Sequence, residues 1–348
     1  MTQLPCYVSG SRIRAVTGYM DVEDIVAGDQ LIALRDGEEV VETVTWVGHR
    51  SVDRSRDPAP EYSAPVRIRK DAIAAGQPSR DLLVSPEHCI FIDGKFFPAR
   101  TLVNGGTIVN ERDARHVTFH HIETERHSVL LAEDLPAESF LNTGNRNELI
   151  GSDEPLVLHP RFAVNPTAER WNTDAAAPLA RTNEEIEPVW RRLMERSESM
   201  GYVPPSVRTD TDAALRAQAH GRVIRPVSDG ADRVVFVLPA ATESVVLSSR
   251  FAIPADLPGF STDNRRLGVR VRAITVQSEA GESVIALDSP SLTTGWQEVE
   301  HGYAEMWRWT NGEATLTLPP TRGAITLTLR AEPLDAYPVY DSGLRLTA

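Results

Sequence analysis

Two regions of the chain alternate apolar and polar positions with the period of a β-strand, and a third region between them does not. The first runs from Cys6 to about Thr143, and the second from about residue 219 to residue 348. In both, short runs rich in β-branched residues are separated by turns that contain Gly, Asp or Asn. Many short strands at close spacing predict an all-β fold for each region.

The region between them contains one segment with helical periodicity. Its apolar stripe consists of Ile186, Val189, Trp190, Leu193 and Met194. Asn183 can cap the first turn of this helix, and Gly201 can end it. The flanking stretches, rich in Asn, Pro and Thr, are typical of irregular connectors.

A length of 348 residues allows about two domains. We therefore expect a mainly β protein in three parts. These are an N-terminal all-β domain over residues 1–145, a short, partly helical connector over 146–218, and a C-terminal β-sandwich accessory domain over 219–348.

The chain is acidic, with 49 Asp and Glu against 36 Lys and Arg and a net charge of −13. This balance disfavours nucleic acid and anionic membrane as partners, because binding phosphate needs clustered basic residues. No run of about 18 apolar residues occurs, so no membrane span is expected. The first residues lack the basic and apolar segments of a secretory signal peptide. Localisation is thus unknown from the sequence, with the cytoplasm as the default and export by another route left open.

Cys6 and Cys89 are the two cysteines of the chain. They make no disulfide framework, although one bridge is not excluded, and free thiols are the default in a reducing compartment. A thiolate is a nucleophile that needs no cofactor, but it usually needs a histidine placed by the fold. Six of the nine histidines lie within the first 127 residues. We therefore expect the reactive chemistry in the N-terminal domain.

His88 stands in LLVSPEHCIFI, where two apolar strand-like runs flank a Ser-Pro-Glu-His turn. Ser85 precedes it by three residues. The hydroxyl could hydrogen-bond a backbone amide while the imidazole protonates the amide nitrogen. A core histidine and a turn-capping hydroxyl are the structural alternatives. Cys89 follows His88 and would point to the opposite side of a strand, so we expect it in the core.

Four blocks between Cys6 and about Phe140 occur in a specific order. They are CYVSGSRI, VEDIVAGDQLIAL, SPEH and VTFHHIETERHSVLLAEDLPAES. The third block carries Ser85 where a threonine is usual. Together the blocks resemble the bacterial form of the Hint domain, the autoprocessing module of hedgehog proteins and inteins. The resemblance implies an all-β, pseudo-two-fold horseshoe for this part of the chain.

The resemblance also implies a self-cleavage reaction on the protein's own N-terminal segment. The Cys6 thiol would attack the carbonyl of Pro5 and convert the scissile amide into a thioester by an N–S acyl shift. His88 would protonate the leaving amine, and Ser85 would hold or twist the scissile peptide. His127 matches the histidine of the last block and is a further candidate for the site. No cofactor is implied.

The chain departs from the family pattern at two places. Inteins end in His-Asn, whereas Ala-Glu-Ser stands at positions 137–139, so we expect N-terminal cleavage without splicing. Glu138 either lines the same cleft or is a surface carboxylate. Hedgehog domains activate cholesterol with an aspartate, whereas Gly48 and His49 occupy that neighbourhood, which argues against a sterol nucleophile. Five residues precede Cys6, which leaves three alternatives open: the native gene starts further upstream, the activity is vestigial, or the chain is already the processed half.

Four histidines occur in HVTFHHIETERH. Strand alternation puts Phe119, His121 and Glu123 on one face and His120 on the other. No Cys or carboxylate set at the usual zinc spacing accompanies them, so we expect no metal site and favour a solvated or site-lining role.

Three of the six tryptophans lie close together in the C-terminal region. Trp296, Trp307 and Trp309, with Tyr303, could form a stacking surface for a glycan or protein partner, and core packing is the alternative. Two other functions therefore stay open beside self-cleavage. One is a non-catalytic Hint scaffold whose C-terminal sandwich binds a glycan or a protein. The other is a conventional Cys-His protease that acts in trans.

Overall fold

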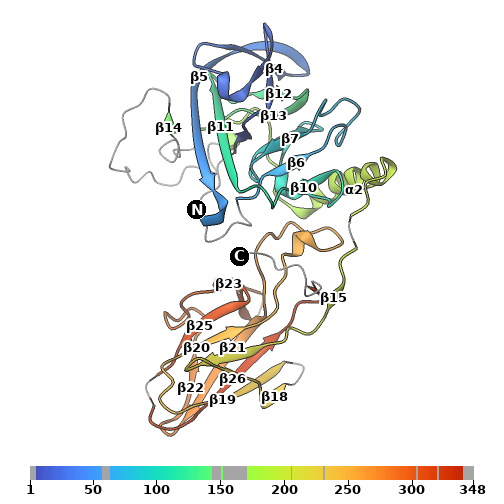
Figure 1. Ribbon diagram of the computed structural model, residues 1–348. Helices are drawn as coiled ribbons and strands as arrows, with labels where there is room; N and C mark the ends of the chain where they lie inside the picture. The colour runs from blue at the N-terminus through green and yellow to red at the C-terminus, as the bar shows by residue number, and fades with distance from the viewer. Residues whose placement is uncertain are drawn as a thin grey trace. The chain divides into compact units, whose positions relative to one another are not determined.

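The computed structural model describes residues 5–56, 63–142, 150–151, 171–204, 206–229, 232–302, 305–319 and 321–339. The chain forms two compact units, Met1–Pro205 and Ser206–Thr347. Both are built mainly of antiparallel β-strands (Figure 1), which confirms the predicted fold class. No helix in the described ranges has the length and apolar character needed to cross a membrane.

Within its described residues, the first unit forms an antiparallel sheet of fourteen strands. The strands are β1 (Tyr7–Val8), β2 (Arg12–Ala15), β3 (Gly18–Asp21), β4 (Gln30–Arg35), β5 (Glu38–Asp53), β6 (Val66–Ile68), β7 (Leu82–Val84), β8 (Cys89–Ile92), β9 (Lys95–Pro98), β10 (Ile108–Asn110), β11 (His116–Thr124), β12 (Val129–Ala132), β13 (Leu135–Glu138) and β14 (Ile150–Gly151). Short 3₁₀ turns occur at η1 (Val22–Asp24), η2 (Arg54–Arg56) and η3 (Ala99–Leu102).

The long strand β5 connects two parts of this sheet. Its first residues pair with β4, from Glu38 to Thr43, and its remainder pairs with β11, from Val44 to Asp53. Figure 1 shows β5 and β11 side by side along most of their length. β11 also pairs with β1 on its other side, so the start of the chain lies against the histidine-rich strand.

Helix α2 (Asn183–Ser199) packs on the first unit. Trp190 Nε1 donates a hydrogen bond to the Val103 carbonyl just after η3, at 2.7 Å. The N-cap is Thr182 and not Asn183 as predicted, because Thr182 has extended backbone angles and its N–H donates to the Glu185 carboxylate at 3.2 Å. This arrangement is a capping box, which satisfies a backbone donor that the helix itself cannot. The helix of the predicted connector therefore belongs to the first compact unit.

The second unit contains a four-stranded and a seven-stranded sheet. Its strands are β15 (Thr209–Asp210), β16 (Arg216–Ala219), β17 (Arg222–Ile224), β18 (Ser228–Asp229), β19 (Arg233–Leu238), β20 (Ser244–Ser248), β21 (Arg270–Ser278), β22 (Gly281–Ile285), β23 (Trp296–His301), β24 (Met306–Thr310), β25 (Glu313–Thr317), β26 (Ile325–Glu332) and β27 (Tyr337–Pro338), with a 3₁₀ turn η5 (Pro254–Asp256). β15 and β27 form a separate pair.

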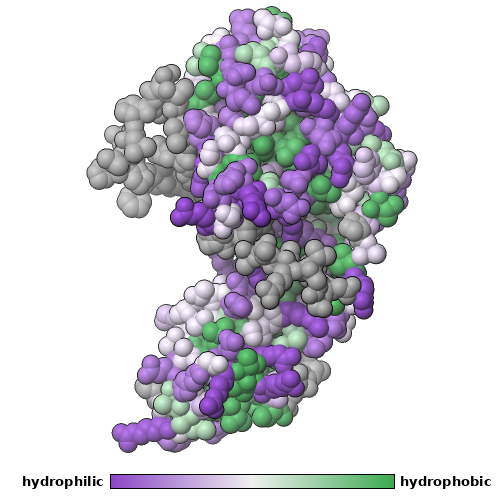
Figure 2. Space-filling model, viewed as in Figure 1, coloured by the Kyte–Doolittle hydropathy of each residue, from purple (hydrophilic) through white to green (hydrophobic). Residues whose placement is uncertain are grey.

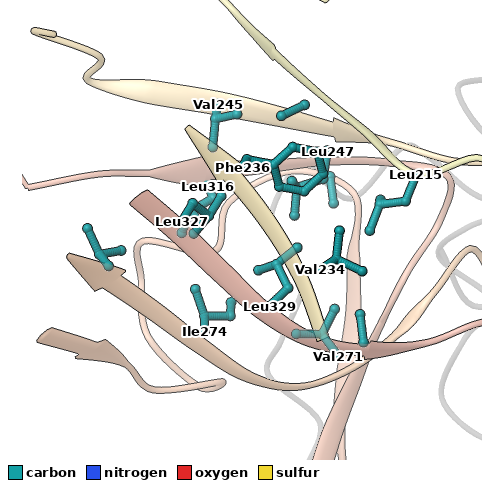
Figure 3. Close-up of a cluster of buried hydrophobic side chains, with 14 of the residues drawn as sticks. Leu215, Val234, Phe236, Val245, Leu247, Val271, Ile274, Leu316, Leu327 and Leu329 are labelled. Atoms are coloured by element: carbon teal, nitrogen blue, oxygen red, sulfur yellow. The ribbon is translucent and has the colours of Figure 1, made fainter. Parts of the chain in front are cut away.

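The core of the second unit lies between its two sheets. Val245 and Leu316 from one sheet meet Phe236, Leu327 and other aliphatic side chains from the other (Figure 3). Every second residue of β26 from Ile325 to Ala331 is buried, as the alternating pattern predicts for a sandwich. Figure 2 shows mainly hydrophilic residues on the drawn face of each unit, which agrees with the charged composition.

Candidate active site

The Cys6 thiol faces a histidine that the pairing of β1 with β11 brings to it. Tyr7 lies opposite His120 in this antiparallel pair, so the preceding residue, Cys6, comes opposite His121. Both side chains are buried, and Cys6 Sγ lies 2.8 Å from His121 Nε2. A nucleophile and a base are thus in direct contact, which is the basic requirement for activating a thiol.

Ser85 binds the backbone of Cys6 on both sides. The Cys6 N–H donates to Ser85 Oγ at 2.8 Å, and the Ser85 N–H donates to the Cys6 carbonyl at 2.8 Å. β7 places Ser85 there, because Val84 pairs with Tyr7. The amide between Pro5 and Cys6 is therefore held by a buried hydroxyl, next to the thiol of the same residue.

His88 is buried close to this amide. Its ring centroid lies 4.2 Å from that of Tyr7, the residue after Cys6, and its N–H donates to the Ser85 carbonyl at 3.1 Å. Neither ring nitrogen of His88 has a hydrogen-bond partner within the described part of the chain. A buried polar side chain in this state is unfavourable for stability, and such groups are often retained for chemistry.

Burial sets the protonation states at the site. Desolvation raises the pKa of Cys6 well above its usual value, and it lowers the pKa of His121 to about 3. Burial also lowers the pKa of His88, and the neighbouring His121 and His127 add to this effect. At neutral pH the site therefore holds a thiol and two uncharged imidazoles.

His127 and Glu138 form a second buried pair. Glu138 Oε1 accepts a hydrogen bond of 2.6 Å from the Cys89 N–H, and Glu138 Oε2 lies 3.5 Å from His127 Nε2. The Ala176 N–H donates to His127 Nδ1 at 3.1 Å. The Tyr7 hydroxyl donates to the Glu138 carbonyl at 2.9 Å, which ties this pair to the strand that follows Cys6.

The structure brings together three of the side chains singled out in the sequence, namely Cys6, Ser85 and His88. It joins His127 to them through Glu138 and Tyr7. In the described ranges, no three His, Cys, Asp or Glu side chains converge as metal ligands.

The sequence alone does not identify His121 as a residue of the site. Alternation correctly separates it from His120, whose Nε2 instead lies 2.7 Å from Ser9 Oγ. Glu123 is less buried than Phe119 and His121, and the alternation of burial ends at Ile122, which is buried directly after His121. His121 is identified as the partner of the Cys6 thiol only by the pairing of β11 with the segment that carries Cys6. No local sequence motif predicts this contact.

The tryptophans of the second unit are half-buried. Trp296 packs against the core and its Nε1 donates to the Thr315 carbonyl at 2.8 Å. Trp307 Nε1 donates to Glu300 at 3.0 Å, and Trp307 and Trp309 each lie against the Arg270 guanidinium. Tyr303 lies outside the described residues. A ligand-stacking role for this group stays a prediction.

Residues 5–144 match the family model of the Hint domain. This part of the chain is therefore a Hint domain, which supports a self-processing fold for it.

Two solved structures are similar to a part of the chain. One is the solution structure of a bacterial intein-like domain from Clostridium thermocellum, with 16% identity over 40% of this chain and 100% of that chain and a TM-score of 0.30. The other is the crystal structure of the gp41-1 intein, with 12% identity over 39% of this chain and 98% of that chain and a TM-score of 0.27. No curated protein matches the chain.

Proposed function

We propose that the Hint domain cleaves its own chain between Pro5 and Cys6 through an N–S acyl shift. The observation that carries the proposal is the double contact at Cys6, whose thiol meets His121 at 2.8 Å while its amide N–H meets Ser85 at 2.8 Å. The attacking sulfur and the scissile amide belong to one residue, so the reaction needs no substrate binding, and proximity supplies much of the rate.

The first step begins with the Cys6 thiol. The sulfur attacks the carbonyl carbon of Pro5 while His121 Nε2 takes the thiol proton. Because burial raises the pKa of Cys6 and lowers that of His121, the ion pair is disfavoured at rest, and the proton moves only as the C–S bond forms. The thiol is therefore kept inert until the scissile carbonyl is in place.

The second step breaks the peptide bond. The proton that His121 has taken passes to His88, whose ring lies against Tyr7. The protonated His88 then gives this proton to the amide nitrogen of Cys6 as the C–N bond opens, and the product is a thioester at Cys6 with a free amine. Ser85 holds the amide nitrogen during this change, and its hydroxyl can rotate to stay bonded to the amine.

The proposal includes release of the N-terminal segment and excludes splicing. Splicing of the intein type needs an asparagine at the C-terminal junction, and the sequence at 137–139 is Ala-Glu-Ser. A nucleophile from outside the chain must therefore open the thioester, as in hedgehog-like cleavage.

The test is the intact mass of the full chain with a small reporter domain fused ahead of Met1. We expect a thiol such as dithiothreitol to accelerate the appearance of a fragment that begins at Cys6, and Cys6→Ala to abolish it. Cys89→Ala is the matched control, because Cys89 is also buried but packs in a different cluster, with Phe96 and Val129, and it should keep cleavage within about threefold. An unchanged mass in the folded wild-type chain would overturn the proposal and favour a Hint scaffold without activity.

A further inference from the structure

The carboxylate of Glu138 has no part in the acyl shift, yet it is buried beside the residues that perform it. Its side chain is about 1% exposed, and only one of its oxygens, Oε1, accepts a hydrogen bond among the described residues. Leaving a carboxylate oxygen desolvated without a hydrogen bond is strongly unfavourable. Packing alone therefore does not explain why a carboxylate occupies this buried position.

The hydrogen bond from the Ala176 N–H determines which ring nitrogen of His127 carries the proton. The Ala176 N–H donates to His127 Nδ1, so Nδ1 carries no proton, and the ring proton of the neutral imidazole is on Nε2. His127 Nε2 lies 3.5 Å from Glu138 Oε2, with no hydrogen bond between the two atoms. The Cys89 N–H donates to the other carboxylate oxygen, Oε1, so each oxygen of Glu138 lies next to a nitrogen of a neighbouring residue.

One member of the pair lines a cavity, and the other contacts the residue that follows Cys6. His127 lines a cavity of about 840 Å³, whose walls include Phe91, Phe140 and Ala176. The Glu138 carbonyl accepts the Tyr7 hydroxyl, one residue after the nucleophile. Burial is the main cause that raises the pKa of Cys6, and the charge of Glu138 adds to it, so the carboxylate is within electrostatic reach of the sulfur.

We propose that Glu138 is the general base for the water that hydrolyses the Cys6 thioester, with His127 as the residue that positions it. Glu138 Oε2 takes a proton from water while the water oxygen bonds to the Pro5 carbonyl carbon. The C–S bond then breaks, and the proton on Glu138 passes to the Cys6 sulfur. The products are an N-terminal segment with a carboxyl group at Pro5 and a domain that begins with Cys6.

This inference rests on the proposed acyl shift, and the two steps can be measured separately. In the reporter-fused full chain, cleavage with added thiol reports formation of the thioester, while cleavage without thiol reports its hydrolysis. For Glu138→Gln we expect thiol-induced cleavage within about threefold of wild type and a loss of hydrolysis of about 100-fold, the range for removing a general base. Wild-type hydrolysis in H₂¹⁸O should place one ¹⁸O in the new carboxyl group.

Glu125→Gln is the control, because Glu125 lines the same cavity from an exposed position, and it should leave both rates unchanged. If both reactions fall together in Glu138→Gln, Glu138 acts on the structure of the site, and the inference is overturned. Unchanged hydrolysis in Glu138→Gln also overturns it and leaves the acyl shift standing. Absence of both reactions in the wild type would instead overturn the proposed function, and this inference with it.

Discussion

The two units are both antiparallel β-structures, but they bury different side chains. The core of the second unit consists of aliphatic and aromatic side chains, and among its described residues the buried side-chain hydroxyls belong to Thr242, Thr310 and Tyr337. The first unit also buries titratable side chains, among them a thiol, three imidazoles and a carboxylate that contact one another or the strand after Cys6. They belong to Cys6, His88, His121, His127 and Glu138.

The difference indicates that the core of the second unit stabilises its fold, whereas the core of the first unit also contains side chains suited to catalysis. Close-packed aliphatic side chains gain free energy from burial and have no unsatisfied polar atoms. Buried imidazole nitrogens without hydrogen-bond partners lose hydration, which destabilises the fold. In a site without water, however, a proton can transfer only between the few groups present. The same all-β architecture thus serves both purposes, and the buried polar residues distinguish them.

The largest effect on cleavage is expected from a substitution that tests the role of the His121 imidazole. His121→Gln removes the base in contact with Cys6 Sγ, and we expect thiol-induced cleavage to slow by about 10²–10⁴-fold. His120→Gln is the matched control, because this neighbour points to the other face of β11 and contacts Ser9. Equal losses in the two variants would contradict the assignment of His121 as the base.

The next effect tests whether the aliphatic core has only a structural role. Phe236 is fully buried between the sheets, and Phe236→Ala should destabilise the second unit by about 3–5 kcal/mol. Hydrogen exchange in β19 and β26 would measure this loss. We expect the cleavage rate at low temperature to change less than twofold, and a parallel loss of cleavage would show that the first unit depends on the second.

A smaller effect concerns the hydroxyl that holds the scissile amide. Ser85→Ala leaves the Cys6 N–H without that acceptor, which costs about 1–3 kcal/mol for a buried donor, and we expect cleavage to slow about tenfold. Ser85→Thr keeps the hydroxyl and should restore most of the rate. Cleavage in Ser85→Ala at the wild-type rate would argue against a role for this hydrogen bond.

The smallest effect is a pH dependence that should differ between the units. The pKa of His121 is lowered to about 3 from 6.5, so between these values the unfolded chain binds a proton that the native chain does not. Stability of the first unit should therefore fall as pH decreases below about 6.5, by up to about 1.4 kcal/mol per pH unit for each such histidine.

Hydrogen exchange measured at pH 7 and pH 5, after correction for the intrinsic rates, would reveal this slope. We expect peptides from β11 to lose protection at pH 5 and those from β26 to keep it. His121→Gln should reduce the slope of the first unit, while His120→Gln should reduce it less, because His120 is only half-buried. Equal slopes in both units would contradict the account of the buried imidazoles.

Much of this organisation can be predicted from the sequence because it is local. Alternation identifies the strands of both units, and the Ser-Pro-Glu-His turn points to Ser85 and His88 without any knowledge of the fold. The partner of Cys6 cannot be predicted in this way. His121 is 115 residues away, and only the register between β1 and β11 brings it to the sulfur. Likewise, no periodicity in the sequence predicts the hydrogen bond between the Ala176 N–H and His127.

The central claim is that the chain forms a thioester between Pro5 and Cys6, and its most direct measurement is tandem mass spectrometry of the fragment released by 2-mercaptoethanesulfonate. The account predicts an N-terminal fragment that ends at Pro5 and carries the added thiol as a thioester on its terminal carbonyl. A fragment that ends at any other residue, or one released with a plain carboxyl group at the same rate with and without thiol, would contradict it.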